Sequence, residues 1–212
     1  MHRWLCLVTS RQRLRLSPGE LVRRIAWLTA AGVDLVQIRE RDLSDRELTA
    51  LVRDALSAAR GTAARVVVND RLDIALAAGA HGIHLREDSI AADRIRRSAP
   101  AGFLIGCSLH DIERARSSSG CDYALFGTVF PSSGKPSDHP AAGLERLRDV
   151  CAAAACPILG IGGITPALAR DVAEAGAGIA SVESLLSVSS AQEAVDVVAA
   201  FRRGLEPRDR AS

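Results

Sequence analysis

The sequence is poor in aromatic residues, in lysine and in long apolar runs. Aromatic side chains make up 3% of the 212 residues, and 25 Asp and Glu nearly balance 27 Lys and Arg. Nucleic-acid-binding proteins usually combine a basic surface with aromatic side chains that stack on bases, so no nucleic-acid partner is expected. No apolar run approaches the ~20 residues of a membrane span, and the stretch 4–9 is too short for a signal peptide. We therefore expect a cytoplasmic protein with no membrane partner.

The cysteines also lack the pattern of a disulfide framework or a metal site. There are five of them, an odd number, and no two form a Cys-x-x-Cys motif. Most lie within apolar runs, where a free cysteine acts as a small hydrophobic residue. Neither structural zinc nor a disulfide framework is expected.

What the sequence does contain is a regular alternation of two periodicities. Eight short apolar runs, typical of strands buried on both faces of a parallel sheet, lie at residues 4–8, 35–38, 66–68, 82–85, 103–106, 123–126, 158–161 and 178–182. Amphipathic segments with helical spacing lie between them, such as 43–59 and 165–175. Ser44 and Ser108 each precede an acidic residue by three positions, which is the spacing of a helix-capping box.

The number of these units indicates the architecture. Eight strand–helix units in 212 residues leave about 26 residues for each, near the small end for a (β/α)8 or TIM barrel. An open doubly wound sheet is the competing fold, but it usually has fewer units and a glycine-rich fingerprint after its first strand, where this chain has Thr9-Ser10-Arg11. We predict a single compact α/β domain, a TIM barrel, over residues 1–205, and a polar tail at 206–212.

In a TIM barrel the C-terminal ends of the strands carry the active site, so the residues found there are informative. Gln37, Arg39 and Arg41 share one side at the end of the second strand, where guanidinium groups would suit phosphate oxygens. Asn69 and Asp70 follow the third strand, and Asp70 is either a first-turn helix acid or a Mg²⁺ ligand.

Three later strand ends add to this pattern. Ser108 and His110 follow the fifth strand, where a histidine is suited to proton transfer near neutral pH. The sixth strand leads into a loop of small and hydroxyl residues around Lys135, the only lysine, which is typical of a phosphate lid, although a compositional bias toward arginine also explains the lysine count. The seventh ends at Gly162-Gly163, where backbone N–H groups can approach an anion.

Together these stretches resemble the superfamily of thiamine phosphate synthase and TenI, the thiazole tautomerase. The matching segments are residues 36–40 (VQIRE), 68–76 (VNDRLDIAL), 82–85 (GIHL), 126–131 (FGTVFP) and 160–166 (GIGGITP). They occur in the family's order within residues 4–186. The resemblance implies an enzyme of thiamine biosynthesis that acts on a small phosphorylated thiazole.

The resemblance also implies roles for individual residues. The thiazole phosphate would be bound by Gly162, Gly163, Ser181, Val182 and Glu183. In the synthases, a hydroxymethylpyrimidine diphosphate and Mg²⁺ bind on the opposite rim. The diphosphate would be bound there by Gln37, Arg39, Arg41, Asn69 and Lys135. Asp70 would hold Mg²⁺, and Ser108 would line the pyrimidine side.

Three positions depart from the synthase pattern. Arg41 stands where the synthases have lysine, which keeps the charge but changes its shape. Ser89 stands where they have a second Mg²⁺-binding aspartate. Glu183 stands where a small residue is usual, and its carboxylate would repel the thiazole phosphate unless the side chain turns away.

Ser89 decides which of two activities, tautomerase or synthase, we place first. Loss of the second metal carboxylate resembles the tautomerases, which move a proton on a carboxylated thiazole phosphate without a diphosphate or a metal. We therefore predict a TenI-like tautomerase without a cofactor, with His110 as proton carrier and Ser108 beside it. The first alternative is a Mg²⁺-dependent thiamine phosphate synthase that also takes the pyrimidine diphosphate. The second is a non-catalytic regulator that binds thiazole phosphate. The sequence does not decide the oligomeric state, and a homodimer is possible because small barrels often pair through apolar helix faces.

Overall fold

The computed structural model describes residues 3–132 and 140–206. Lys135 and most of the predicted lid loop therefore lie outside the described residues, as do residues 207–212 of the predicted tail. Within the described part, no helix combines the length and the apolar character needed to cross a membrane.

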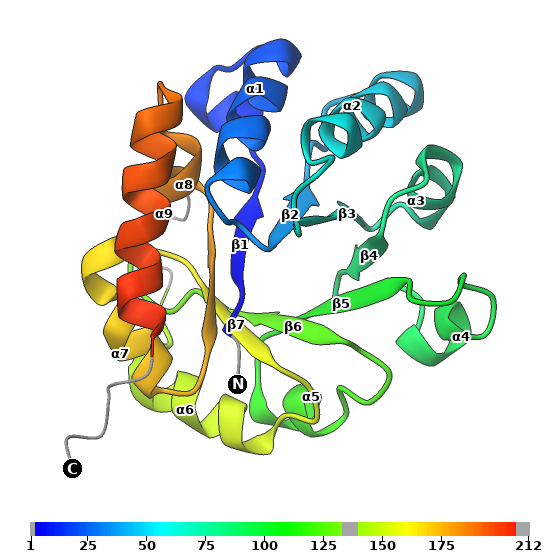
Figure 1. Cartoon of the computed structure of the whole chain (residues 1–212). Coiled ribbons are helices and arrows are strands. Elements are labelled where there is room, and N and C mark those ends of the chain that lie inside the picture. Colours follow the sequence, from blue (N-terminus) through cyan, green and yellow to red (C-terminus); the bar gives the residue numbers. More distant parts are fainter. Residues whose placement is uncertain (1–2, 133–139, 207–212) are drawn as a thin grey trace.

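Eight parallel strands close into a barrel, with each strand paired to the next along the chain and β8 paired to β1 (Figure 1). The strands are β1 (Leu5–Val8), β2 (Leu35–Ile38), β3 (Arg65–Asn69), β4 (Gly82–Leu85), β5 (Leu104–Leu109), β6 (Tyr123–Phe126), β7 (Ile158–Ile161) and β8 (Gly178–Ser181). The predicted TIM barrel is confirmed. Continuous apolar runs predict these strands well because each is covered on one face by helices and on the other by the barrel interior.

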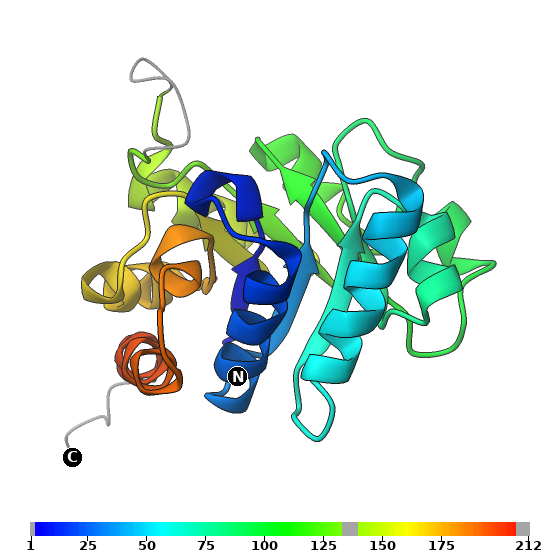
Figure 2. The ribbon, with the colours of Figure 1, turned by 90° about the horizontal axis from the view of Figure 1, so that it is seen from above.

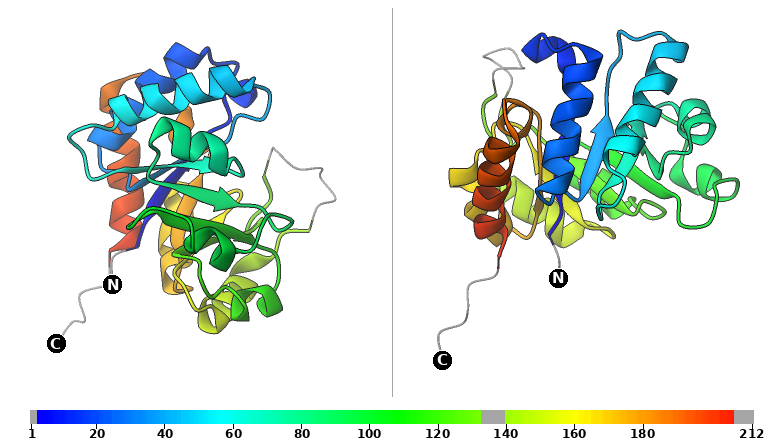
Figure 3. Two further views of the ribbon diagram at one scale, coloured as in Figure 1. Left: turned by 90° about the vertical axis from the view of Figure 1, so that its right-hand side faces the viewer. Right: turned by 45° about the horizontal axis from the view of Figure 1, so that its top comes forward.

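Helices surround the strands on the outside of the barrel (Figure 2). They are α1 (Pro18–Ala30), α2 (Asp45–Ala58), α3 (Leu72–Ala78), α4 (Ala92–Arg96), α5 (Ile112–Arg116), α6 (Gly143–Ala153), α7 (Ala169–Glu174), α8 (Glu183–Leu186) and α9 (Ala191–Leu205), with the 3₁₀ turns η1 (Arg11–Leu14) and η2 (Pro166–Leu168). The last helix, α9, packs against both α1 and α7, so it completes the helical layer beside the first strand (Figure 3).

The barrel interior has its own apolar core, separate from the layer between strands and helices. Tyr123 is fully buried there, and its ring lies 5.7 Å from that of Trp4, centroid to centroid. Gly106 on the neighbouring strand makes room for it, because a Cβ at Gly106 would lie 2.1 Å from the Tyr123 Cζ. With this close approach, the Tyr123 hydroxyl lies 3.2 Å from the His84 Nδ1.

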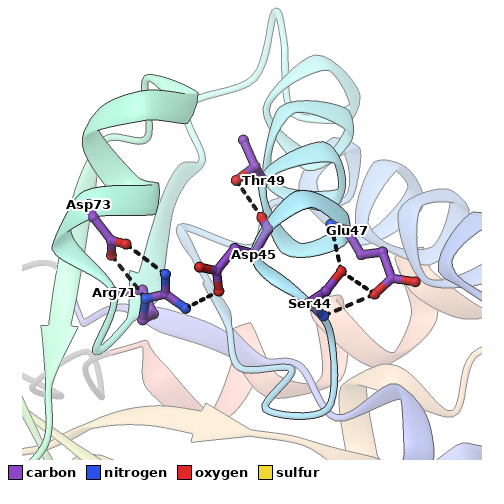
Figure 4. Close-up of polar contacts among 6 residues, drawn as sticks. All are labelled: Ser44, Asp45, Glu47, Thr49, Arg71 and Asp73. Atoms are coloured by element: carbon purple, nitrogen blue, oxygen red, sulfur yellow. Dashed lines mark hydrogen bonds and ion pairs between the residues drawn. The ribbon is translucent and has the colours of Figure 1, made fainter.

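The start of α2 is fixed by two sets of polar contacts (Figure 4). The Ser44 hydroxyl accepts a hydrogen bond from the Glu47 backbone N–H, and the Glu47 carboxylate accepts one from the Ser44 backbone N–H, so the predicted capping box is confirmed. Arg71 joins this helix to α3, since its guanidinium donates to Asp45 at 2.6 Å and to both carboxylate oxygens of Asp73. The turn that follows β3 is thereby held against α2.

The second predicted capping box is wrong. Ser108 lies inside β5, which runs on to Leu109, and α5 begins after Asp111, whose own side chain accepts from the Arg114 backbone N–H. The reason is tertiary: β5 pairs with β6 as far as Leu109, opposite Phe126, so the polar Ser108 remains in the strand. Its side chain then points into the barrel.

Candidate functional site

A cavity of about 910 Å³ opens at the C-terminal ends of the strands. Nearly every predicted site residue lines it. From β2 and β3 come Gln37, Arg39, Arg41 and Asn69; from β5 come Ser108 and His110; from the ends of β7 and β8 come Gly162, Gly163, Ser181, Val182 and Glu183. The placement of polar residues at strand ends thus predicted one common surface, as the barrel geometry requires.

The β2–β3 side of the cavity carries a buried amide acceptor. The Gln37 side chain is buried, and its Nε2 donates to the Asn69 Oδ1 at 2.9 Å. Its Oε1 is also buried and has no hydrogen-bond partner in the described chain. Because a buried polar atom without a partner is costly, this oxygen is suited to accept a hydrogen bond from a ligand N–H or O–H.

Arg39 and Arg41 make the same side cationic. Burial, and then the nearby charge of Arg41, lowers the pKa of Arg39, but guanidinium groups stay protonated in proteins. In the part of the chain that the structure describes, neither side chain forms an ion pair with a carboxylate, whereas Arg86 beside them does. Two cations that form no ion pair within the described residues, at a cavity wall, are suited to bind an anion such as a diphosphate.

His84 and Ser108 lie at the floor of the cavity and belong to a chain of three polar side chains that ends at the buried Tyr123. The His84 Nε2 lies 3.0 Å from the Ser108 Oγ, and its Nδ1 lies 3.2 Å from the Tyr123 hydroxyl. Burial, and then the positive charge of Arg39, lowers the pKa of His84 to about 3. The imidazole is therefore neutral at pH 7, and it holds the Ser108 hydroxyl at the cavity surface.

The opposite side of the cavity is the glycine turn after β7. Gly162 and Gly163 have φ angles of 101° and 63°, which favour glycine. A Cβ at Gly162 would lie 2.5 Å from the Thr128 Cγ2, and one at Gly163 would lie 2.4 Å from the Pro131 carbonyl oxygen. The Ser184 Oγ donates to the Ile164 carbonyl at 3.0 Å and ties this turn to the end of β8. The paired glycines therefore allow both the backbone conformation and the close packing that shape this wall.

Glu183, the unexpected acid at the end of β8, has a basic partner. Its Oε1 lies 2.8 Å from the Nε of Arg13 in η1. The η1 turn is itself anchored to β2, because the buried Glu40 carboxylate accepts from the Arg11 backbone N–H at 3.0 Å. The ion pair offsets the negative charge of Glu183 at this end of the cavity.

Ser108 and His110, the two predicted catalytic residues, have different surroundings. Ser108 is bonded to His84, whereas the His110 side chain is 54% exposed and its Nε2 lies 3.8 Å from the Glu87 Oε2. The spacing of two residues puts both on the cavity side, but only Ser108 remains within the strand. His110 lies at the rim, after the strand has ended.

Asp70, the predicted Mg²⁺ ligand, faces a smaller adjoining cavity of about 280 Å³. Its Oδ1 accepts a hydrogen bond from the Ser89 hydroxyl, and its Oδ2 lies 3.5 Å from the Arg86 Nη1. No group of three or more His, Cys, Asp or Glu side chains that could hold a metal occurs among the described residues. With both carboxylate oxygens already engaged and serine at the second position, this donor set does not fit a Mg²⁺ site.

Sequence reasoning missed three arginines that line the cavity, namely Arg13, Arg86 and Arg114. Arg86 directly follows β4, so the strand-end rule could have identified it. Arg13 lies five residues beyond β1 and Arg114 lies within α5, and only the folded chain brings them to the cavity.

Comparison with known proteins finds relatives that match this chain over most of its length. Residues 5–186 match the family model described as thiamine monophosphate synthase. A thiamine-phosphate synthase from Methanoregula boonei is 39% identical, covering 88% of this chain and 83% of that protein, and one from Moorella thermoacetica is 39% identical, covering 91% and 89%. The solved structure of a thiamine phosphate pyrophosphorylase from Pyrococcus furiosus is similar, with a TM-score of 0.79, 28% identity and 95% of each chain covered. The likeness therefore spans the barrel and its cavity.

Proposed function

This chain belongs to the thiamine monophosphate synthase family, and on that premise we propose that it is a thiamine-phosphate synthase. Such an enzyme joins hydroxymethylpyrimidine diphosphate to thiazole phosphate and releases pyrophosphate. The names of the relatives support this reaction over the tautomerase that Ser89 favoured, so the order of the two sequence-based alternatives is reversed. Membership of the family makes the chain an enzyme of thiamine biosynthesis in either case.

One observation carries the proposal: the cavity has an anion-binding feature at each of two separate ends. Arg39 and Arg41 line the side formed by β2 and β3, and the Gly162-Gly163 turn follows β7. Arg39 and Arg41 follow β2, which is three strands from β7 around the closed barrel, so the two features lie on different sides of the cavity. A synthase needs one site for a diphosphate and another for a phosphate, whereas a tautomerase needs only the second.

The reaction can then be assigned to this geometry. The bond between the pyrimidine methylene carbon and the diphosphate oxygen breaks, and its electron pair leaves with pyrophosphate. Arg39 and Arg41 are placed to stabilise the negative charge that develops on the leaving oxygens. The thiazole nitrogen donates its lone pair to the methylene carbon and forms the new C–N bond. Neither step transfers a proton, which accords with a neutral His84 at the floor and a largely exposed His110 at the rim.

The pyrimidine ring is assigned to the space between the two anion sites. The buried Gln37 Oε1 is an acceptor without a partner in the described chain, so it suits the amino group of the pyrimidine better than a phosphate oxygen. This revises the role expected from the resemblance, in which Gln37 holds the diphosphate. Ser108, fixed by His84, offers a hydroxyl to the same ring.

Mg²⁺ is the cofactor that the resemblance implies for a synthase. When bound, such an ion neutralises the oxygens of a departing diphosphate. Because Asp70 is paired with Arg86 and Ser89, the residues present do not fit this role, and the steps above use only cations of the protein. Mg²⁺ therefore stays a prediction from the resemblance alone.

The test supplies both substrates to the purified protein. We expect thiamine phosphate and pyrophosphate to appear in equal amounts, both in buffer with Mg²⁺ and in buffer with EDTA. Chromatography measures the thiamine phosphate, and a coupled phosphate assay on the quenched reaction measures the pyrophosphate. A parallel reaction contains only carboxylated thiazole phosphate. Aromatisation of that compound without any thiamine phosphate would reject the synthase in favour of the tautomerase. Binding of thiazole phosphate with neither reaction would favour the regulator.

A further inference from the structure

Arg86 occupies a central position between the two cavities. It follows β4 directly, and it lines both the large cavity and the smaller one that contains Asp70. Its Nη2 lies 2.8 Å from the Asp88 Oδ2, and its Nη1 lies 3.5 Å from the Asp70 Oδ2. Two carboxylates therefore hold one guanidinium at the wall where the proposed diphosphate site lies.

Both the backbone and the side chain of Asp70 have defined contacts beside this arginine. Its φ angle is 59°, in the left-handed region, and its backbone N–H donates to the His84 carbonyl at 2.9 Å. The next residue, Arg71, is held by Asp45 and Asp73. The Asp70 carboxylate thus lies between two partners, with Ser89 on one oxygen and Arg86 near the other.

The other carboxylates near Asp70, those of Glu87 and Asp88, also have basic partners. Glu87 lies 3.5 Å from the Arg114 Nε and 3.8 Å from the His110 Nε2. Asp88 is paired with Arg86. A divalent cation at Asp70 would compete with the Arg86 guanidinium for the same carboxylate oxygen, and it would have Ser89 rather than a second acid opposite.

We infer that Arg86 takes the place of a metal ion in this chain and binds the diphosphate directly, together with Arg39 and Arg41. A guanidinium has five N–H donors, so Arg86 keeps donors for phosphate oxygens beside its contacts with Asp70 and Asp88, and it carries its charge without a bound metal. Pyrophosphate binding should therefore not depend on a divalent cation. This inference rests on the proposed function, because it assigns the ligand of the cationic side of the same cavity.

The first experiment needs no variant. Inorganic pyrophosphate is titrated into the wild-type protein by calorimetry, once in EDTA and once with Mg²⁺. We expect dissociation constants within about threefold of each other, because the protein supplies the positive charge itself. Pyrophosphate binding that requires Mg²⁺ would overturn the inference.

Two matched pairs of variants test whether Arg86 and Ser89 determine pyrophosphate binding and its independence from Mg²⁺. Arg86→Ala should weaken pyrophosphate binding in EDTA by about tenfold or more, whereas Arg97→Ala, which removes the same charge from an exposed residue outside both cavities, should change it by less than about twofold. Ser89→Asp should weaken binding in EDTA and allow Mg²⁺ to restore it, whereas the neutral Ser89→Asn should not create this dependence. Circular dichroism checks that each variant is folded. Unchanged binding by folded Arg86→Ala would contradict the role of Arg86.

The outcomes also separate this inference from the proposed function. Metal-independent pyrophosphate binding without formation of thiamine phosphate would reject the synthase while Arg86 keeps its role as an anion ligand. Formation of thiamine phosphate only with Mg²⁺, together with Mg²⁺-dependent pyrophosphate binding, would reject the role of Arg86 while the synthase stands.

Discussion

The Nε of Arg13 lies 2.8 Å from the Oε1 of Glu183, and this ion pair joins the segment after β1 to the segment after β8. The two residues are far apart in sequence, but β1 and β8 are neighbours in the closed barrel. The pair explains how an acidic residue can stand at the predicted thiazole-phosphate site. It places a cation beside the carboxylate, so an incoming phosphate meets a nearly neutral wall.

Glu183→Gln should strengthen the binding of thiazole phosphate by roughly threefold, because the repulsive charge is removed while Arg13 remains. Arg13→Ala should weaken binding by roughly tenfold, since it leaves a carboxylate without this partner facing an anion. Calorimetry with thiazole phosphate measures both. The double variant should return close to the wild-type affinity. Weaker binding in Glu183→Gln would instead show that Glu183 is needed to position Arg13.

The neutral His84 should make folding stability depend on pH. Its pKa is about 3 in the folded protein against 6.5 for the ordinary side chain. The unfolded state therefore binds the extra proton between these values, and stability should fall by up to about 1.4 kcal/mol per unit as the pH drops below 6.5. Urea unfolding of wild type and His84→Gln from pH 4 to 8 measures the difference, in which other titrating groups cancel. Tyr123→Phe, which keeps the imidazole, should retain the slope; an identical slope in His84→Gln would contradict the assignment.

Gly163→Ala should lower the free energy of unfolding by more than the positive φ angle of Gly163 alone explains. Gly102 provides the control, because its φ of 73° resembles the 63° of Gly163. A Cβ at Gly102 would have no atom within 4 Å, whereas a Cβ at Gly163 would meet the Pro131 oxygen. We expect Gly102→Ala to cost about 1 kcal/mol and Gly163→Ala about 2 kcal/mol more. Urea unfolding gives both values. Gly163→Ala should also lose thiazole-phosphate binding, and equal costs at the two sites would contradict the close packing.

Ser108 and His110 should differ in their importance for catalysis. Ser108→Ala removes a hydroxyl held at the cavity floor by His84, and thiamine phosphate formation should slow by roughly tenfold. His110→Ala removes a side chain that is 54% exposed, and the rate should change by less than about threefold. Initial rates with both substrates measure the two effects. A large loss in His110→Ala would return the proton-transfer role to this histidine.

Much of the fold follows from local sequence. The continuous apolar runs predict the strands because every strand is covered on both faces, and Ser44 with Glu47 predicts the start of α2 because a capping box forms within four residues. The end of β5 could not be predicted in the same way. Ser108 is a polar residue that belongs to the strand only because β6 pairs with it and His84 shares a hydrogen bond with its hydroxyl.

The candidate site likewise has some features that local sequence predicts and others that depend on tertiary contacts. By itself the sequence determined the barrel, the strand ends that line its cavity and the glycine pair at residues 162–163, because these depend on periodicity, spacing and backbone freedom over short stretches. Only the tertiary structure decided that Glu183 is paired with Arg13, that His84 is buried and neutral, and that Asp70 is engaged by Arg86 and Ser89. These contacts join residues from different strand–helix units, so they form only when those units pack side by side, and the Arg13–Glu183 pair forms only when β8 closes against β1.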